Sequence, residues 1–304
     1  MTHSYQAASL GRENLYSERI AQALEATPRL FPEKAVIACQ GVEGAYSQTA
    51  AERLFREPTV SHMKSFETVF AAIDSGLCRY GVLPLENSTA GSVNRIYDLM
   101  TRYRFSIVRS VRVKIDHSLL ALPGASVEGI REVYSHEQAI SQCSEFLKSH
   151  PRMRVTACEN TAAAAKLVAE SGRTDIAALA SHSCAELYGL STLAASVQDN
   201  GNNHTRFICI GRELEIFPGA DRTSVMLTLP HRPGALYRIM ARITALGINL
   251  TKLESRPLPD RDFEFMFYFD LDTPVYSPNL IQLIGDLEYM SESFRYLGSY
   301  SEII

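Results

Sequence analysis

The densest group of side chains that could do chemistry lies in residues 83–100, LPLENSTAGSVNRIYDLM. Five of its members carry donor or acceptor groups within seven positions, and they are Glu86, Asn87, Ser88, Thr89 and Ser92. A helical pattern begins directly after them, and the amide groups at the amino end of a helix attract an anion. A capped turn needs only one such side chain. We therefore interpret this segment as a binding site for a small oxyanion such as a carboxylate.

A second polar group precedes an apolar strand pattern in residues 197–211, VQDNGNNHTRFICIG. A polar turn would account for Asp199 and the asparagines, but Thr205 and Arg206 stand at the mouth of the strand. Arginine is the usual two-pronged partner of a carboxylate, and threonine is a neutral hydrogen-bond donor. Ligands of open α/β sheets bind at strand ends, so we expect the two polar segments to meet there.

Two other segments leave alternatives open. Residues 41–55, GVEGAYSQTAAERLF, form either an anion site at a helix start, with Ser47 among its donors, or a tight turn with a cap. In residues 135–147, SHEQAISQCSEFL, a single helix would place Gln138 and Gln142 on one shared face. Those amides would either serve a ligand or remain solvated, and the residues alone favour solvation.

Most other catalytic patterns are missing from the sequence. The eight histidines form no H-x-x-x-H pair and none joins a cysteine at metal-binding spacing, so no metal site is expected. His136 and His204 lie in the polar loops, where a structural role is commoner than a catalytic one. Neither a glycine motif for nucleotides nor a G-x-S-x-G nucleophile motif occurs. The aromatic run FEFMFYF lacks the basic neighbours that a nucleobase platform needs.

The elements that must position these groups alternate between short apolar runs and amphipathic helices. Strands are predicted at 35–39, 80–85, 106–113, 131–135, 154–158, 175–180 and 206–211. Helices are predicted where apolar residues recur at helical spacing, in 66–73, 96–103 and 160–172. Alternation of this kind indicates an α/β fold with a largely parallel sheet.

The pattern changes after residues 217–222, where proline and glycine interrupt it. The elements predicted beyond are a strand at 224–230, a helix from Pro233 to Gly247, strands at 248–258 and 263–272 joined around PDRD, a helix at 280–287 and a strand near SFRYLGS. Their order, βαββαβ, is that of the ferredoxin-like unit.

The composition bounds the class of protein. The chain has 304 residues, 46% of them apolar, with a formal net charge of −4 and a pI near 6.1. That size favours two domains, and the lack of a basic field argues against nucleic acid or an anionic membrane as a partner. Six widely spaced cysteines are typical of free thiols in a reducing compartment, and no signal peptide is evident, so we expect a cytoplasmic protein.

Taken together, these segments resemble the prephenate dehydratase family from about residue 34 to the C-terminus. The family hallmark is an acidic or amide residue, five positions and then Thr-Arg-Phe, which here begins at Asp199 and ends at Phe207. GVEGAYS, LPLENSTAGSV and SHEQAISQC match family blocks in the same order. PGALYRI (233–239) and LESRP (253–257) match the two signature pieces of the family's ACT domain.

The resemblance implies a domain order and an activity. Residues 1–32 would be a leader or connector, 33–215 a catalytic domain with two α/β lobes like a type II periplasmic binding protein, and 222–304 the ACT domain. The resembled enzymes convert prephenate to phenylpyruvate, water and carbon dioxide. Recovery of ring aromaticity drives that reaction, so neither a cofactor nor a metal is expected. The family also implies a homodimer or homotetramer whose paired ACT domains bind phenylalanine as an allosteric inhibitor.

The resemblance also assigns residues. It implies that Thr205 is the donor to the departing hydroxyl and ties three further positions to activity, Asn87, Glu86 and Gln142. Our candidates for holding the substrate are Arg206, Ser88, Thr89, Gly91, Ser92 and Ser47. The candidates for binding phenylalanine are Gly234, Ala235, Leu236, Asn249, Glu254, Ser255, Arg256 and Pro257.

Several points leave the interpretation open. Glu137 stands where the family usually has proline, which alters a loop constraint and leaves Thr205 untouched. SYQ near residue 4 faintly resembles the end of a chorismate mutase domain, so residues 1–32 are either part of a fusion or a vestigial leader. Arogenate dehydratase, which uses the amino-acid form of the substrate, and a non-catalytic amino-acid sensor are the alternative functions.

Overall fold

The computed structural model describes residues 15–258 and 264–304, which divide into two compact units. The large unit comprises residues 33–103, 111–209 and 303–304. The C-terminal unit comprises the described residues of 1–32 together with 104–110 and 210–302. The division passes through three strands, β5 (Ser106–Lys114), β11 (His204–Gly211) and β16 (Glu302–Ile303), so neither unit is a single stretch of chain.

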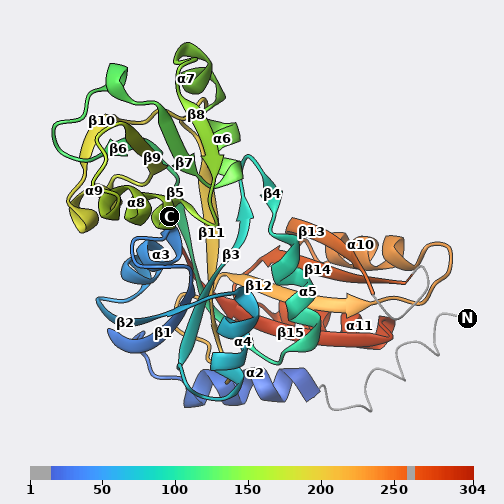
Figure 1. Ribbon diagram of the computed structural model, residues 1–304. Helices are drawn as coiled ribbons and strands as arrows, with labels where there is room; N and C mark the ends of the chain where they lie inside the picture. Colours follow the sequence, from blue (N-terminus) through green and yellow to red (C-terminus); the bar gives the residue numbers. More distant parts are fainter. Residues whose placement is uncertain (1–14, 259–263) are drawn as a thin grey trace, which may run out of the picture. The chain divides into compact units, whose positions relative to one another are not determined.

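The first sheet has seven strands in the order β16-β5-β11-β3-β1-β2, with β4 paired to β3 (Figure 1). Its other elements are β1 (Lys34–Gln40), α3 (Tyr46–Leu54), β2 (Glu57–Met63), α4 (Phe66–Asp74), β3 (Tyr80–Asn87), β4 (Gly91–Ser92), α5 (Asn94–Arg102) and β16 (Glu302–Ile303). β1 is parallel to both β2 and β3. The helices α3, α4 and α5 pack against these strands because each has one apolar stripe.

The second sheet has five strands in the order β10-β6-β9-β7-β8. Its elements are β6 (Ser118–Ala121), η1 (Val127–Gly129), β7 (Glu132–Ser135), α6 (Glu137–Gln142), α7 (Ser144–Ser149), β8 (Arg154–Ala157), α8 (Thr161–Glu170), β9 (Ile176–Ala180), α9 (Ser183–Tyr188) and β10 (Ser191–Ala194). Every residue of β9 is buried, and successive ones alternate between a core under α8 and α9 and a core under α7. Helices therefore cover both faces of this sheet, as Figure 1 shows.

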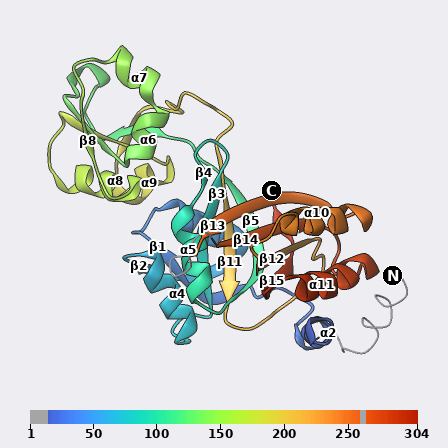
Figure 2. The same ribbon diagram turned by 90° about the vertical axis from the view of Figure 1, so that its right-hand side faces the viewer.

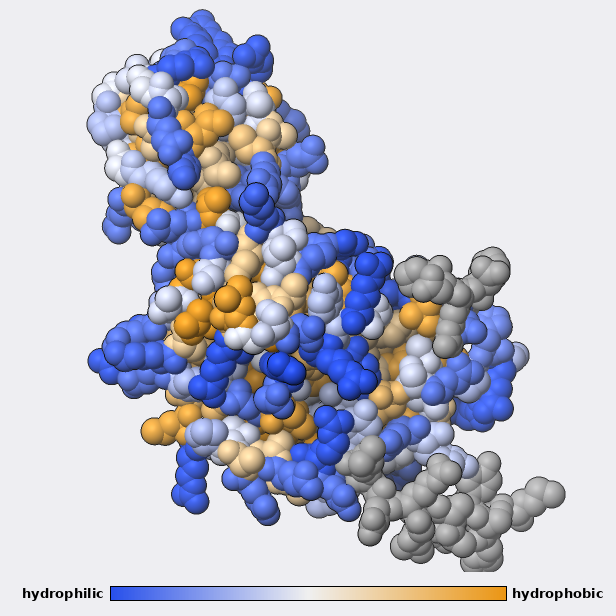
Figure 3. All heavy atoms as spheres, turned by 60° about the horizontal axis from the view of Figure 1, so that its bottom comes forward, coloured by the Kyte–Doolittle hydropathy of each residue, from blue (hydrophilic) through white to orange (hydrophobic). Residues whose placement is uncertain are grey.

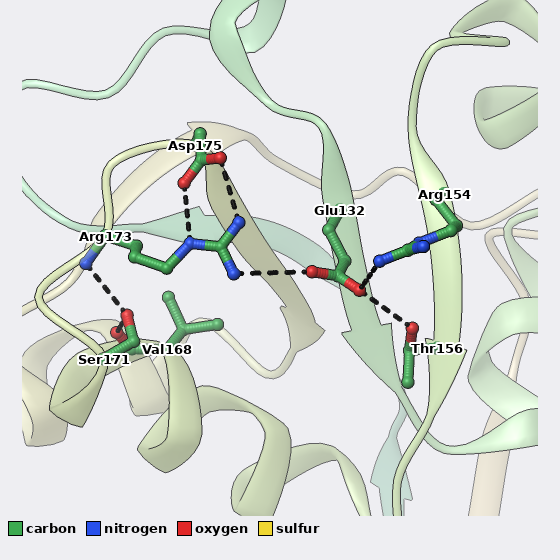
Figure 4. Close-up of polar contacts among 7 residues, drawn as sticks. All are labelled: Glu132, Arg154, Thr156, Val168, Ser171, Arg173 and Asp175. Atoms are coloured by element: carbon green, nitrogen blue, oxygen red, sulfur yellow. Dashed lines mark hydrogen bonds and ion pairs between the residues drawn. The ribbon is translucent and has the colours of Figure 1, made fainter.

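An ion-pair network closes the amino ends of the parallel strands in the second sheet (Figure 4). Glu132 at the start of β7 accepts from Arg154 at 2.8 Å and lies 3.6 Å from Arg173, which also pairs with Asp175. The hydrogen bond from Arg154 is the main reason that the pKa of Glu132 lies below its ordinary value. The opposite ends of these strands are their carboxyl ends, where ligands of open α/β sheets usually bind.

The C-terminal unit is built on a four-stranded antiparallel sheet in the order β13-β14-β12-β15. Its elements are β12 (Arg222–Thr228), α10 (Ala235–Ala245), β13 (Asn249–Pro257), β14 (Phe265–Asp272), α11 (Pro278–Met290) and β15 (Ser293–Tyr300). Alternate residues such as Val225, Leu227 and Phe269 join Ile239 and Ile284 of the two helices in one core. The expected βαββαβ order is confirmed, as is the α/β class of the whole chain.

A helix before the first sheet also belongs to the C-terminal unit. In α2 (Leu15–Ala26), Ile20 is 1% exposed and Ala23 is 7% exposed, both within the core that α11 helps to form (Figure 2). The Tyr16 hydroxyl donates to the carbonyl oxygen of Phe294 at 3.0 Å. Residues that the sequence suggested as a leader or connector therefore contribute a packed helix to this unit.

The structure differs from the expected elements at several places. Strands β2, β6 and β10 were not predicted, and the second sheet is mixed, because β6 runs antiparallel to β9 and β10. The single helix expected over 135–147 is broken at Cys143 into α6 and α7. Pro233 precedes the N-cap residue Gly234 instead of lying in the first turn of α10. The turn around PDRD lies outside the described residues.

Candidate active site

Two side chains from adjacent strands form the centre of the site. Asn87 is the last residue of β3, and Thr205 is the second residue of β11, the neighbouring strand. Asn87 Nδ2 donates to Thr205 Oγ1 at 2.9 Å, and both residues are 8% exposed. The sequence expected these two polar segments to meet at strand ends, and the geometry brings them into hydrogen-bond contact.

The turn after β3 fixes the orientation of Asn87. The backbone N–H groups of Thr89 and Ala90 donate to Asn87 Oδ1 at 3.0 and 2.9 Å. This is the local turn that asparagine side chains favour, with the oxygen toward the backbone two and three residues on. The Asn87 carboxamide is therefore held with its nitrogen toward Thr205.

The Thr205 hydroxyl is left with a proton to donate. A hydroxyl carries one donor and two acceptor positions, and here its oxygen already accepts from Asn87. Among the residues that the structure describes, no acceptor lies within hydrogen-bond distance of that proton. Thr205 is therefore a neutral donor aimed by a neutral amide.

Two further amides extend the contact to the second sheet. Asn87 Nδ2 also donates to Asn203 Oδ1 at 2.7 Å, and Asn203 Nδ2 donates to Gln142 Oε1 at 3.0 Å. Asn203 is 2% exposed. His117 Nε2 lies 3.2 Å from the same Gln142 oxygen. A chain of hydrogen bonds thus runs from the end of β3 to α6.

Gln142 owes its position to the break between α6 and α7. The Asp199 carboxylate accepts from the backbone N–H groups of Ser144 and Glu145, each at 3.0 Å, and from the Ser144 hydroxyl at 2.9 Å. The backbone N–H of Asp199 donates to the carbonyl oxygen of Gln142 at 2.7 Å. Asp199 therefore caps α7 and also holds the backbone of Gln142, the residue before the break. This double contact explains why an acidic residue stands six positions before Thr205.

The carboxamide nitrogen of Gln142 is the second open donor of the site. Its oxygen accepts from Asn203 and lies against His117, so the two hydrogens on Nε2 point away from both. Within the described part of the chain no acceptor is within reach of that nitrogen. Two uncharged donors, the Thr205 hydroxyl and the Gln142 amide, therefore remain available to a ligand rich in oxygen.

His117 lies at the junction of β5 and β6 and is 2% exposed. Burial lowers the pKa of its imidazole below 6.5, while the hydrogen bond to Gln142 and the charge of Asp116 act in the opposite direction. The ring is therefore neutral at pH 7. The Tyr46 ring packs edge-on against it, with centroids 6.2 Å apart.

The structure separates Glu86 and Arg206 from the other candidates. Successive residues of a strand point to opposite faces, so Glu86 and Arg206 lie on the face away from Asn87 and Thr205. They pair with one another across the two strands, with Arg206 Nη1 3.3 Å from Glu86 Oε1. Arg206 is 6% exposed. This pairing favours a structural role for both residues over direct contact with the same ligand.

The candidates in the turn after β3 mainly hold the turn itself. The Ser88 hydroxyl donates to Asn202 O at 3.2 Å and accepts from the backbone N–H of His204 at 3.0 Å. Gly91 has a φ of +81°, a conformation that glycine adopts without strain. Thr89 and Gly91 are exposed and Ser92 is half-buried, so these three lie at the rim. Two backbone N–H groups of this turn, those of Thr89 and Ala90, are used to orient Asn87.

Ser47 is also engaged within its own element. Its hydroxyl donates to Gln40 O at 2.7 Å at the start of α3. In the glycine-rich loop before it, the backbone N–H of Gly44 donates to Gln48 Oε1 at 3.0 Å. A Cβ atom on Gly44 would lie 2.9 Å from Leu187 Cδ2 on α9, so glycine there permits close packing between the two sheets' loops. The tight-turn interpretation therefore fits this segment better than an anion site.

The candidates for binding phenylalanine lie at two ends of the C-terminal sheet. β12 and β13 both run antiparallel to β14, so the last residues of both strands lie at the same end of the sheet, and the start of α10 follows β12 there. Gly234, with a φ of +78°, Ala235 and Leu236 lie there, as do Glu254 and its three successors. Asn249 is the first residue of β13, at the opposite end of the sheet, where it pairs with Asp272 of β14. In a single chain the eight residues therefore do not form one cluster.

Two members of the site were missed in the sequence. Asn203 was one of several polar loop residues and carried no distinguishing signal. His117 sits between two apolar strands, and a lone histidine there is more often part of the core. Asp199 was noted only as part of the hallmark, and its capping role depends on a helix break that periodicity did not reveal.

Within residues 15–258 and 264–304, no group of three or more histidine, cysteine or acidic residues is arranged to hold a metal ion. No helix in the same ranges is both long and apolar enough to cross a membrane. All six cysteines are free thiols, five of them buried.

Comparison with known proteins identifies the family. A sequence profile described as prephenate dehydratase matches residues 37–215. Arogenate dehydratase/prephenate dehydratase 1 of Arabidopsis thaliana is 37% identical over 284 residues, covering 88% of this chain and 72% of that protein. Arogenate dehydratase 2 of Petunia hybrida is 38% identical over 281 residues, covering 87% and 71%.

Two solved structures match most of the chain. Prephenate dehydratase of Arthrobacter aurescens, in complex with L-Phe, has a TM-score of 0.80 and 28% identity, covering 88% of this chain and 90% of that one. GqqA, described as a novel type of quorum quenching acylase, has a TM-score of 0.80 and 31% identity, covering 87% and 97%. The family profile spans more than half of the chain, and the plant relatives align with both units. The chain therefore belongs to the prephenate dehydratase family.

Proposed function

We propose that this chain is a prephenate dehydratase, which converts prephenate to phenylpyruvate in phenylalanine biosynthesis. One observation carries the proposal. The Thr205 hydroxyl oxygen accepts a hydrogen bond from Asn87, and the hydroxyl proton has no acceptor among the described residues. The chain belongs to a family of dehydratases, which are enzymes of the lyase type. A dehydration needs a hydrogen-bond donor for the hydroxyl group that leaves. A preorganised neutral donor is suited to that task.

The balance of the reaction matches the donors of the site. The bond from the ring to its carboxylate breaks and releases carbon dioxide, and its electron pair enters the ring. The bond from the ring to the para hydroxyl breaks, and the hydroxide leaves with one proton as water. Thr205 Oγ1 donates a hydrogen bond to that departing oxygen. Because a threonine hydroxyl is a very weak acid, we assign it hydrogen bonding and leave the proton to bound water.

Carboxylate recognition falls to the other groups of the site. Gln142 Nε2 donates to one substrate carboxylate, because its two hydrogens are the remaining open donors in the chain of hydrogen bonds. Thr89 and Gly91 are exposed in the turn after β3 and Ser92 is half-buried there, while Ser88 holds the turn to residues 202–204. Arg206, Glu86 and Ser47 support the strands and the helix that carry these groups.

The C-terminal unit is proposed to be an ACT domain that binds phenylalanine and inhibits the enzyme. The βαββαβ order, PGALYRI and LESRP support this, as does the related structure in complex with L-Phe. Gly234, Ala235, Leu236, Asn249, Glu254, Ser255, Arg256 and Pro257 are the proposed contacts. A cytoplasmic homodimer or homotetramer is part of the same proposal, because residues at both ends of the sheet would then be brought together by pairing.

A second candidate is arogenate dehydratase, which forms phenylalanine directly. Several plant relatives bear that name, and some bear both names. The two substrates differ only at the side chain that carries a keto group or an ammonium group. The donors around Thr205 face the parts that the substrates share, so the same site chemistry serves both.

The acylase name of one structural neighbour gives a third activity to compare. An acyl-transfer nucleophile needs a base that takes its proton. Thr205 Oγ1 instead contacts an amide nitrogen, and no base among the described residues is within hydrogen-bond distance of it. This geometry favours hydrogen-bond donation over nucleophilic attack.

The experiment supplies purified chain with prephenate and arogenate in separate assays and in competition. We expect phenylpyruvate from prephenate, with inhibition by added phenylalanine. A higher kcat/KM with arogenate would shift the assignment to the second candidate. Phenylalanine binding without turnover of either dienoic acid would instead support an amino-acid sensor.

Inhibition has a separate test in the C-terminal unit. Ser255→Ala and Gly234→Ala are expected to relieve inhibition by phenylalanine without lowering basal activity. Gly247→Ala is the matched control, since Gly247 has a similar φ of +64° at the other end of α10. Unchanged inhibition in both test variants would place the phenylalanine site elsewhere.

A further inference from the structure

The direction of the hydrogen bonds in the site can be traced from its fixed end. The backbone N–H groups of Thr89 and Ala90 both donate to Asn87 Oδ1, so Asn87 Nδ2 must face Asn203. Asn203 then presents Oδ1 to Asn87 and Nδ2 to Gln142. Gln142 in turn presents Oε1 to Asn203 and to His117. Each amide orientation follows from the one before it, and the first is set by backbone groups that cannot reverse.

This direction determines the tautomer of His117. Its Nε2 lies 3.2 Å from Gln142 Oε1, an oxygen that carries no proton, so the hydrogen of the neutral ring is on Nε2. His117 Nδ1 is then a lone pair, buried and without a hydrogen-bond partner among the described residues. His117 is only 2% exposed. A buried, unpartnered nitrogen beside a ligand site calls for an explanation.

We propose that His117 is a positioning residue of the dehydratase site, and that its Nε2–H holds the Gln142 carboxamide with both Nε2 hydrogens toward the substrate. The inference rests on the proposed function and adds a residue that the sequence did not single out. Gln142 Oε1 receives one hydrogen bond from Asn203 and one from His117, which fills both of its acceptor positions. Rotation of the amide by a half turn would place two donors against two donors.

The surroundings of His117 keep it in the neutral form. Tyr46 on α3 packs against the imidazole in a T-shaped arrangement, and burial raises the pKa of the Tyr46 hydroxyl. Asp116 is the neighbouring carboxylate, but it accepts from Gln198 at 2.7 Å and pairs with Lys114 at 3.0 Å. Burial also raises the pKa of Cys143, beside Gln142, to about 12. A second proton on His117 would add a buried charge with no acceptor for its new N–H.

Two substitutions distinguish the nitrogen that matters. His117→Gln keeps a neutral N–H donor near the position of Nε2 and removes Nδ1. His117→Leu removes both nitrogens and keeps an apolar side chain in the core. We expect His117→Leu to lower kcat/KM by about 10- to 100-fold, the usual cost of losing a group that orients a ligand-binding residue. We expect His117→Gln to recover most of that loss.

A double-mutant cycle shows whether His117 acts through Gln142. Gln142→Ala removes the amide that His117 is proposed to hold, so adding His117→Leu should cost less than about twofold further. If the fold-losses in kcat/KM of the two single variants multiply in the double variant, the proposal is contradicted. Equal losses in His117→Gln and His117→Leu would contradict it too, because Nδ1 would then be the group that acts. If His117→Leu fails to fold, His117→Met takes its place in the cycle.

A measurement without turnover tests the geometry alone. Nitrogen chemical shifts of the imidazole in the whole chain at pH 7 are expected to show hydrogen on Nε2 and a bare Nδ1. Hydrogen on Nδ1 or on both nitrogens would overturn the inference. A wild-type chain that turns over neither dienoic acid defeats the proposed function, whereas an active wild type with an equally active His117→Leu variant defeats only the inference.

Discussion

The carboxamide of Asn87 joins a backbone turn to the hydroxyl of Thr205. Its oxygen is held by two amide groups of the turn, and its nitrogen is aimed at Thr205. Neither partner is charged, so the site is preorganised by direction and not by a strong local field. In the proposed reaction such a donor would stabilise the departing hydroxide.

Asn87→Asp isolates that role. The carboxylate still accepts from the turn amides, but it offers no hydrogen to Thr205 Oγ1 and repels the Asn203 oxygen. We expect kcat to fall by about 100-fold, or about 2.7 kcal/mol of transition-state stabilisation. Steady-state kinetics of phenylpyruvate formation measure the change. Asn160→Asp, which keeps a cap at the start of α8, is the control and should leave kcat unchanged.

The sequence revealed the donors more readily than their supports. Asn87 and Thr205 stood out because each belongs to a dense polar segment beside a strand. Arg206 stood out for the same reason, yet the alternation of the strand turns it to the opposite face, where Glu86 pairs with it. His117 carried no signal, because its importance depends on a contact with Gln142, 25 residues away.

The break between α6 and α7 is the element that brings the second sheet into the site. A continuous helix would have no free N–H groups at Ser144 and Glu145, since each would bond to the preceding turn. Asp199 takes both groups and also holds the carbonyl of Gln142 through its own backbone N–H. One loop residue therefore caps α7 and fixes the position of the Gln142 backbone.

Asp199→Ala tests this double role. Losing the cap should lower the free energy of unfolding by about 1–2 kcal/mol, and displacement of Gln142 should lower kcat/KM about tenfold. Urea unfolding and kinetics give the two values. Ser65→Ala removes the cap of α4, so it should cost similar stability and leave kcat/KM unchanged. A stable but inactive Asp199→Ala variant would instead mean that Asp199 contacts substrate.

The network at the amino ends of β7 and β9 predicts a dependence of stability on pH. Hydrogen bonds from Arg154 to Glu132 and from Arg173 to Asp175 lower the pKa of each carboxyl group in the folded state. A lowered pKa stabilises the fold above the value of the unfolded chain, and this stabilisation is lost as the pH falls through the folded pKa. The effect therefore lies below about pH 4.5, the ordinary value for glutamate.

Glu132→Gln checks the sign of that effect. At pH 7 the variant should unfold at a lower urea concentration than wild type, because the ion pairs with Arg154 and Arg173 are lost. The difference should shrink as the pH is lowered from 5 to 3, where wild-type Glu132 takes up its proton. A difference that grows on acidification would contradict the assignment.

The expected elements were confirmed where apolar periodicity was strong, as in β3, α4 and β14. β6 and β10 were missed because SLLA and STLA are short and offer no alternation to read. β2, with the sequence EPTVSHM, has half-exposed residues and a proline at its second position, so it did not read as a strand. β9, which runs parallel to β7, thus has an antiparallel neighbour, β6, that the sequence pattern did not reveal.

Each compact unit of the molecule combines segments distant in the sequence. The C-terminal unit includes α2, whose Ile20 lies in a core with Leu283 and Leu287 of α11. Periodicity indicated a weak helix there, but the partner of its apolar face lies more than 250 residues further along the chain. That packing could not be predicted from local sequence.

Ile20→Ala measures how much α2 contributes. Removing a side chain that is 1% exposed leaves a cavity, so we expect the C-terminal unit to lose about 2–4 kcal/mol of unfolding free energy. Thermal unfolding and proteolysis report the change. Gln22→Ala, at an exposed position of the same helix, should change it by less than about 0.5 kcal/mol. Equal stability of Ile20→Ala and wild type would mean that α2 does not pack as described.

The charge of the whole chain gives no general attraction for a dianionic substrate. The net charge is −4, and the face drawn in Figure 3 mixes hydrophilic and apolar residues. Recognition of the proposed substrate would therefore depend on local donors in the large unit, and these are uncharged at Thr205 and Gln142. Weak dependence of KM on salt is the consequence.

The most direct measurement compares phenylpyruvate formation by wild type, Thr205→Ser and Thr205→Val. Valine keeps the shape of threonine and removes the hydroxyl, which is both the proposed donor and the acceptor of the hydrogen bond from Asn87, whereas serine keeps the hydroxyl. We expect Thr205→Val to lower kcat by about 10²- to 10⁴-fold with a folded chain, and Thr205→Ser to stay within about tenfold of wild type. Thr192→Val on β10 is the control and should match wild type. A Thr205→Val variant that keeps more than half of the wild-type rate would contradict the assignment of the hydroxyl as the donor.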